Sequence, residues 1–187
     1  MEETRGDAGI GLGDGIAALS NRFYDAIRHP DAYKAHAAPA GSDFSLLSGH
    51  KYALLETFRA NGQVVPTPIW FGLADGRVFV RTEAKVGKVK RIRANGRARL
   101  APCNARGRPL GPAVEGTARI LAPDEEPHAE AALAANYGVS RKIYESAGEK
   151  LGVDAIYIEV TPDSGGAAVA ADRPGPLGPS EEEEEAE

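Results

Sequence analysis

The sequence predicts a mainly β protein, a small barrel with helical decoration. Three observations carry this prediction: six short strand-like segments, hairpin turns between the early ones, and helical periodicity only after the third segment and before the last. Hairpin turns favour an antiparallel sheet, and a decorated barrel buries one face of it. The 187 residues, 42% apolar and 26% charged, suit one soluble globular domain with tails.

The first three predicted strands are joined by two strong turn signals. The strands cover Lys51–Phe58, Gln63–Leu73 and Arg77–Thr82. Asn61-Gly62 and Asp75-Gly76 separate them, and such dipeptides favour tight hairpins. Pro66 and Pro68 lie two residues apart and therefore face the same way. Because proline cannot donate to a β-ladder, the second strand is expected at a sheet edge or rim.

Helical and strand patterns alternate after the third strand. Val86, Val89 and Ile92 share one helical stripe, and Asn95-Gly96 is a helix stop. The later segments are strands at Ala98–Pro102 and Ala113–Leu121, helices over 125–149 with a break near Gly138, and a last strand at Asp154–Thr161. The last strand alternates aliphatic with aromatic or charged residues, which predicts a half-buried strand.

Composition divides the chain into three parts. Residues 1–43 are predicted to be a partly disordered N-terminal tail with a helix over 15–36, which Pro30 ends or breaks. Residues 44–162 form the barrel domain. Residues 163–187, composed of Gly, Pro, Ala and Glu, are predicted to be a disordered acidic tail.

The net charge of −5 conceals a basic segment inside the body of the protein. The last seven residues hold six carboxylates, whereas the segment from Arg77 to Arg119 holds nine Arg and three Lys against Glu83 and Glu115, a local net charge of +10. So concentrated a charge repels itself unless an anion lies nearby. Phosphate, a polycarboxylate, nucleic acid and the acidic tail are the candidates.

Several function classes are excluded by composition. No apolar run approaches the ~20 residues of a membrane helix, and the acidic start is no signal peptide, so the cytoplasm is the expected compartment. The single Cys103 and the four scattered histidines offer no metal-binding spacing. Nucleophile and Walker motifs are absent. The basic stretch lacks interleaved aromatics, which argues against nucleic acid.

The first group of candidate functional residues follows the third predicted strand. Thr82 is a plausible N-cap for the next helix, and a helix N-terminus attracts anions. At 100° per residue, Lys85, Lys88 and Arg91 share one flank of that helix. They could hold a phosphate or carboxylates; the alternative is a solvated basic face.

The second constellation is the proline-rich strand ahead of the only tryptophan. Pro66 and Pro68 stiffen the backbone and expose neighbouring carbonyls and amides, and Trp70 follows. A flat aromatic ligand could lie against such a rim. The alternative is an edge strand with a core tryptophan.

These segments resemble a known family. The residues that carry the resemblance are Phe58–Gly62, Val65–Phe71, Val80–Thr82, Gly87–Arg93, and Leu100–Cys103 ahead of Arg106-Gly107. Together they resemble the pyridoxamine 5′-phosphate oxidase-like class of coenzyme F420-dependent oxidoreductases from actinobacteria. The resemblance implies a six-stranded split β-barrel of the FMN-binding type, a homodimer, and a cofactor in a groove at the subunit interface.

The resemblance also implies site residues. In related flavin-binding oxidases a strand-end Thr and a Lys six residues later contact the cofactor phosphate, and Thr82 and Lys88 have that spacing. Those oxidases also use an Arg and a Lys five apart, at positions that are Pro66 and Phe71 here. Neither residue can bind phosphate, which argues against a pyridoxamine phosphate oxidase and against FMN.

The expected protein is therefore an oxidoreductase that transfers a hydride from reduced F420 to a small organic acceptor. The expected cofactor-binding residues are Pro66, Thr67, Pro68, Ile69, Trp70, Arg81, Thr82, Lys85, Lys88, Lys90 and Arg91. No catalytic side chain is assigned; Tyr137, Tyr144 and Tyr157 are proton donors only in principle. The alternatives are a non-catalytic protein that binds F420, flavin, haem or another tetrapyrrole, and an FMN-dependent oxidoreductase.

Overall fold

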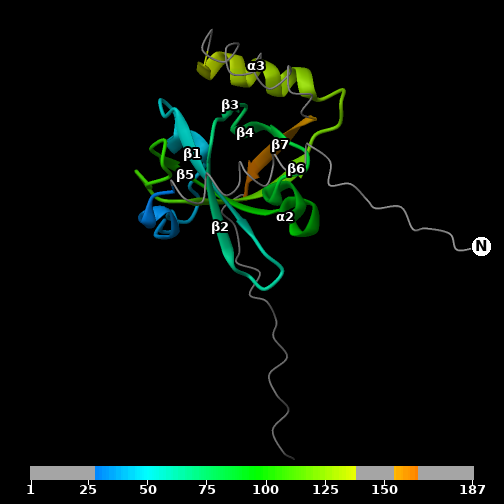
Figure 1. The fold of residues 1–187 in the computed structure, drawn as a ribbon. Coiled ribbons are helices and arrows are strands. Elements are labelled where there is room, and N and C mark those ends of the chain that lie inside the picture. Colours follow the sequence, from blue (N-terminus) through cyan, green and yellow to red (C-terminus); the bar gives the residue numbers. More distant parts are fainter. Residues whose placement is uncertain (1–27, 138–153, 164–187) are drawn as a thin grey trace, which may run out of the picture.

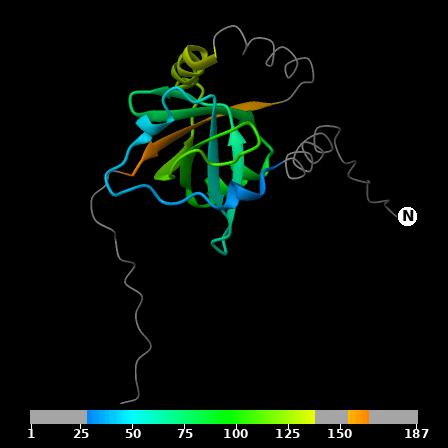
Figure 2. The same ribbon diagram turned by 90° about the vertical axis from the view of Figure 1, so that its left-hand side faces the viewer.

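The structure, a computed structural model, describes residues 28–137 and 154–163. All seven strands of this part form one curled antiparallel sheet in the order β2-β1-β5-β6-β7-β4-β3 (Figure 1). The strands are β1 (Tyr52–Phe58), β2 (Val64–Ile69), β3 (Gly72–Ala74), β4 (Arg77–Glu83), β5 (Arg97–Cys103), β6 (Val114–Ile120) and β7 (Ala155–Pro162). The turned view in Figure 2 shows the curl of the sheet.

The sheet curls because its two edge strands follow each other directly in the chain. β2 and β3 lie at opposite ends of the strand order, yet only Trp70 and Phe71 separate them. This connection spans at most about 11 Å. Seven flat strands would place the edges roughly 28 Å apart. The edges must therefore approach each other at this point, which makes the sheet a split barrel.

The prediction of a mainly β barrel is confirmed, with one strand more than expected. The predicted second strand breaks at Trp70 and Phe71, so that β2 and β3 replace it. The break has a physical reason: the Phe71 side chain is buried in the core, and its amide donates to the Tyr137 hydroxyl at 2.9 Å instead of to a ladder. β2 lies at a sheet edge, as its prolines predict.

Four helical elements accompany the sheet in the described residues. They are the 3₁₀ turns η1 (Pro30–Tyr33) and η2 (Phe44–Leu47) and the helices α2 (Gly87–Asn95) and α3 (Glu126–Tyr137). α2 ends where predicted, with Gly96 in the left-handed conformation at φ 63°. Pro30 lies at the first position of η1. The remainder of the predicted 15–36 helix, the break near Gly138 and the acidic tail lie outside the described residues.

The barrel interior and the outer face under α3 form two apolar clusters. Val89 and Ile92 of α2 pack into the interior with Leu55, Leu100 and Ile158. On the opposite face, α3 packs on β4 and β7 through Ala129, Leu133, Phe79 and Tyr157. β7 is therefore buried on both faces, and the prediction of a half-buried last strand is wrong because α3 covers its second face. No helix of the described part is long and apolar enough to cross a membrane.

Replacing Gly72 tests how closely the edge strand β3 meets α3. A Cβ at this position would lie 2.4 Å from the main-chain carbon of Ala132, and backbone cannot yield as a flexible side chain can. Gly72→Ala should lower the free energy of unfolding by about 1–3 kcal/mol in urea titration. The control is Gly87→Ala, whose Cβ meets only the mobile end of Arg91 and should change stability by less than about 0.5 kcal/mol. Equal effects would contradict the packing.

Candidate functional site

The candidate site lies where β4 passes into α2. Lys88, in the first turn of α2, donates from Nζ to the Thr82 hydroxyl of β4 at 2.8 Å. Thr82 is not the helix N-cap, which corrects the sequence prediction: it lies within β4, and the helix starts at Gly87 after the cap residue Val86. The loop between them folds Lys88 back over the strand.

The N-terminus of α2 has no side-chain cap. Val86 makes no capping hydrogen bond from its side chain, while its carbonyl accepts the amides of Val89 and Lys90 at 3.1 and 3.4 Å. The first amides of a helix have no partner within the helix, and the dipole places partial positive charge beside them. This end of the nine-residue helix is therefore suited to an anion.

Arg91 adds a second cation at the same end of the helix. Its Nε donates to the Thr57 hydroxyl of β1 at 2.7 Å. A Cβ at Gly87 would lie 3.0 Å from Arg91 Nη1, so the guanidinium folds back beside the start of α2. Sequence reasoning missed Thr57. The sequence did contain a signal for it: Thr57 alternates with Ala53 and Leu55 along the strand, so a polar side chain lies on the face of β1 that points to the core.

Lys88 is half-buried, and its ammonium has little compensating charge nearby. Burial lowers its pKa from 10.5 to about 8; the attraction of Glu83 opposes the shift, and the repulsion of Arg91 adds to it. Among the described residues, the Lys88 ammonium donates to the neutral Thr82 hydroxyl and to no carboxylate. An incoming anion would supply the missing negative charge. Thr82, Lys88 and Arg91 therefore fit a phosphate.

The other cations predicted for this site do not converge on it. Lys85 is exposed in the loop before α2, and Lys90 is exposed on the helix. Arg81 alternates with Thr82 along β4 and lies opposite Tyr157 of β7, on the face that α3 covers farther along. Of the five predicted cations, only Lys88 and Arg91 flank the uncapped helix end.

The free edge of β2 offers carbonyl groups but no amides at its prolines. Pro66 pairs with Glu56 and Pro68 with Leu54 across the β1–β2 ladder. Because proline has no N–H, the ladder hydrogen bonds must run through the intervening residues, and the carbonyls of Pro66 and Pro68 point to the open edge. This edge resists addition of another strand and can accept hydrogen bonds from a ligand.

The side chains around these prolines point in different directions. Thr67 lies on the inner face with Val65, whose carbonyl lies 3.5 Å from the Thr57 hydroxyl. Ile69 is buried in the barrel core. Trp70 stacks on Tyr137 under α3, with ring centroids 4.8 Å apart. Thr67 and the buried Ile69 are thus the predicted side chains of this strand that share a face with Thr57, the partner of Arg91.

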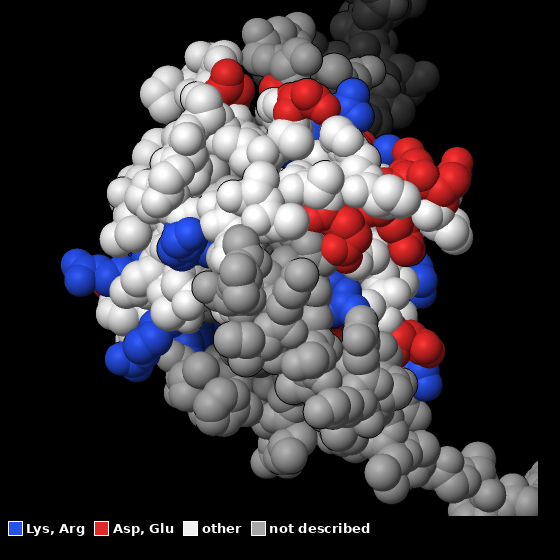
Figure 3. All heavy atoms as spheres, turned by 90° about the horizontal axis from the view of Figure 1, so that it is seen from above, with Lys and Arg blue, Asp and Glu red and all other residues white. Residues whose placement is uncertain are grey.

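Part of the basic segment is neutralised within the fold. Glu159 of β7 forms ion pairs with Arg77 at 3.2 Å and with Arg119 at 2.9 Å. Glu56 of β1 forms an ion pair with Arg99 at 2.7 Å. These carboxylates come from outside the segment, which is why the sequence count overstates the charge. On the face that carries α3, acidic side chains gather to one side (Figure 3). Four further cations of the segment, Lys88, Lys90, Arg91 and Arg93, lie on α2.

Few side chains of the described part could act as acid, base or nucleophile. The Tyr137 hydroxyl accepts from the Phe71 amide and donates to the Lys51 carbonyl, and burial raises its pKa to about 12. Tyr157 is buried in the cluster beneath α3. Burial also raises the pKa of Cys103 to about 12, so this thiol is inert. Within residues 28–137 and 154–163 no group of His, Cys, Asp or Glu could hold a metal ion.

The fold and site together define a split-barrel protein with an anion-binding helix end beside an open sheet edge. The chain belongs to the pyridoxamine 5′-phosphate oxidase family, because residues 44–163 match the model of that family. No curated protein sequence matches this chain.

Solved structures with this fold are distant in sequence. The heme storage protein HutZ from Vibrio cholerae superposes with a TM-score of 0.50 at 14% identity, covering 64% of this chain and 87% of that chain. The conserved hypothetical protein Rv2991 from Mycobacterium tuberculosis gives 0.49 at 16% identity, covering 68% and 84%. A FAD-binding protein from Mesorhizobium loti gives 0.46 at 13% identity, covering 63% and 83%. At these identities the likeness concerns the fold alone.

Removing the Lys88 charge should stabilise the ligand-free protein. The folded pKa of about 8 lies below the ordinary 10.5, so the unfolded chain binds more protons between these values and stability rises with pH across this window. At pH 7 the buried charge costs roughly 1–3 kcal/mol. Lys88→Met should recover that amount in urea titration at pH 7, and the gain should shrink as the pH approaches 10.5.

The matched control for this measurement is the exposed Lys90 on the same helix. Lys90→Met should change the free energy of unfolding by less than about 0.5 kcal/mol at any pH. Destabilisation by Lys88→Met at pH 7 would show that the ammonium is well compensated and would contradict this description of the site.

Proposed function

We propose that this protein is an F420-dependent oxidoreductase that reduces a small organic acceptor. The proposal rests above all on the buried Lys88 ammonium, which is held by the Thr82 hydroxyl at an uncapped helix N-terminus. Such a group favours a bound phosphate. Arg91 supplies further positive charge for an anionic ligand that extends from the phosphate.

The preference for F420 over FMN is supported by the residues of β2 and its end. Pro66 is buried against β1, and Phe71 is 1% exposed in the barrel core. Both are apolar, and they occupy the two positions at which related flavin oxidases place phosphate-binding cations. FMN would thus lack half of its usual phosphate contacts here. The phosphodiester and oligoglutamate tail of F420 can instead use the cations of α2.

The chain's own residues would bind and orient the cofactor. Thr82, Lys88 and the first amides of α2 would hold the phosphate, and the carbonyls of Pro66 and Pro68 would accept hydrogen bonds from the ring edge. When bound, reduced F420 would supply a hydride from carbon five of its ring. Of the tyrosines considered as proton donors, Tyr137 is engaged in hydrogen bonds and Tyr157 is buried, so the accompanying proton would come from solvent.

The proposal includes a homodimer and a small-molecule acceptor. The resemblance to the F420-using class supports both, since that class binds its cofactor at a subunit interface. A non-catalytic carrier of F420, flavin or a tetrapyrrole would share the binding site but show no turnover. Binding and turnover are therefore measured separately.

A fluorescence titration with F420 and with FMN tests the proposed cofactor. Wild-type protein should bind F420 more tightly than FMN. Lys88→Ala should weaken F420 binding by about 10- to 100-fold, because a charge-assisted hydrogen bond in a buried site is lost. Lys90→Ala, which removes an exposed charge from the same helix, should change the affinity by less than about threefold. Tighter FMN binding would contradict the proposal.

The affinity for F420 should depend on pH above about 8. The Lys88 pKa of about 8 means that the free protein loses this proton as the pH rises, while a bound phosphate requires the charged amine. Affinity should be constant from pH 6.5 to 7.5 and then fall by up to tenfold per pH unit. Lys88→Met should bind weakly with no such slope. A slope that persists in this variant would assign the titration to another group.

A further inference from the structure

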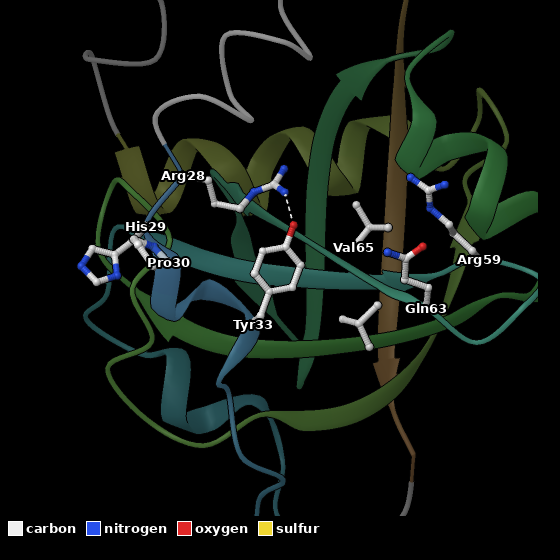
Figure 4. Close-up of a pocket in the computed structure, with 8 residues that line it drawn as sticks. Arg28, His29, Pro30, Tyr33, Arg59, Gln63 and Val65 are labelled. Carbon is white, nitrogen blue, oxygen red and sulfur yellow. Dashed lines mark hydrogen bonds between the residues drawn. The ribbon is translucent and has the colours of Figure 1, made fainter.

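A hollow separate from the helix-end site lies between η1 and the β1–β2 hairpin. It has a volume of about 240 Å³, which suits a molecule with a single ring rather than a cofactor. Its lining consists of Arg28, His29, Pro30, Tyr33, Arg59, Gln63, Val64 and Val65. Figure 4 shows the Arg28 guanidinium and the Tyr33 ring on one side and Val65, Gln63 and Arg59 on the other.

Both walls of the hollow are held in place by hydrogen bonds. On the hairpin side, the Arg59 amide donates to the Gln63 carbonyl at 2.9 Å, and Gly62 donates back to the Arg59 carbonyl at 2.9 Å. On the η1 side, the His29 amide donates to the Arg106 carbonyl at 2.7 Å, and Ala32 is fully buried. The hollow is therefore formed before a ligand arrives.

The lining residues within the described part of the chain carry positive charge and no carboxylate. Arg28 and Arg59 approach the hollow from opposite walls, and none of the eight lining residues is acidic. Asp31, the acidic residue within η1, forms an ion pair with Lys34 at 2.7 Å. No hydrogen bond or ion pair from the Arg59 side chain to the described residues is found. This charge distribution selects an anion.

The Tyr33 ring gives the hollow a flat apolar wall. Tyr33 is 59% exposed, although it is one of the largest apolar side chains. Its hydroxyl accepts a hydrogen bond from Arg28 Nη1 at 2.9 Å, which fixes the ring (Figure 4). Val64 and Val65 provide methyl groups on the β2 side. An exposed, oriented ring facing aliphatic groups suits a planar ligand.

We propose that this hollow binds a small aromatic carboxylate. The carboxylate would lie between the Arg59 and Arg28 guanidinium groups, and the ring would lie between Tyr33 and the valines of β2. Guanidinium groups bind carboxylates with two parallel hydrogen bonds, and this geometry favours a planar acid over a spherical anion. The site does not use Lys88, so it stands independently of the proposed cofactor.

The test is a calorimetric titration of the full chain with benzoate, benzylamine and inorganic phosphate at low salt. Benzoate should bind, and benzylamine, which has the same ring and the opposite charge, should not. Arg59→Gln should weaken benzoate binding by about tenfold or more. Tyr33→Leu, at an exposed position, should weaken it by a smaller factor while leaving the fold intact.

Two matched variants locate the binding. Arg93→Gln removes an exposed arginine of α2, and Lys88→Met removes the cation of the helix-end site; both should bind benzoate as the wild type does. Absence of benzoate binding, equal binding of benzylamine, or binding of phosphate as tight as benzoate in Lys88→Met, which lacks the cation of the helix-end site, would overturn the proposal. So would a loss of benzoate affinity in Arg93→Gln equal to that in Arg59→Gln.

Discussion

The two-residue link between β2 and β3 is the constraint on which the rest of the structure depends. Trp70 and Phe71 join the opposite edges of a seven-stranded sheet, so the sheet has to curl until those edges meet. Tyr137 secures the link, because its hydroxyl accepts from the Phe71 amide and donates to the Lys51 carbonyl. The curled sheet encloses a core into which α2 packs, and this packing brings Thr57 of β1 to Arg91.

Charge compensation distinguishes the structural cations from those of the candidate site. Arg77, Arg99 and Arg119 reach carboxylates of other strands, and such pairs hold neighbouring strands in register. Lys88 is half-buried, and its ammonium has a neutral hydroxyl as its hydrogen-bonding partner. A buried charge without a strong partner lowers the stability of the folded protein. Such a charge is typical of a functional site, where a ligand of opposite charge can pair with it. The binding energy of an anion would offset the cost of burying this ammonium.

The sequence predicted what depends on local spacing and missed what depends on pairing between distant strands. The turns at Asn61-Gly62 and Asp75-Gly76 and the end of α2 follow from short-range patterns. The joint role of Thr82 and Lys88 came from the family resemblance, whereas the local pattern wrongly made Thr82 the N-cap. The sequence did not predict that the strand breaks at Trp70–Phe71, because the apolar residues of this segment continue through the break with no change in their spacing. Two features depend on how distant strands pair. They are the carboxylates that the arginines contact and the side of the sheet on which Arg81 lies.

The central claim is that a cofactor phosphate binds at the start of α2. Amide chemical shifts recorded by NMR while F420 is added to the full chain test it most directly. The account predicts the largest shifts at Gly87, Lys88 and Val89, with smaller ones along the edge of β2, and saturation at a single affinity. Large shifts confined to residues distant from α2, with the amides of Gly87 and Lys88 unmoved, would contradict it.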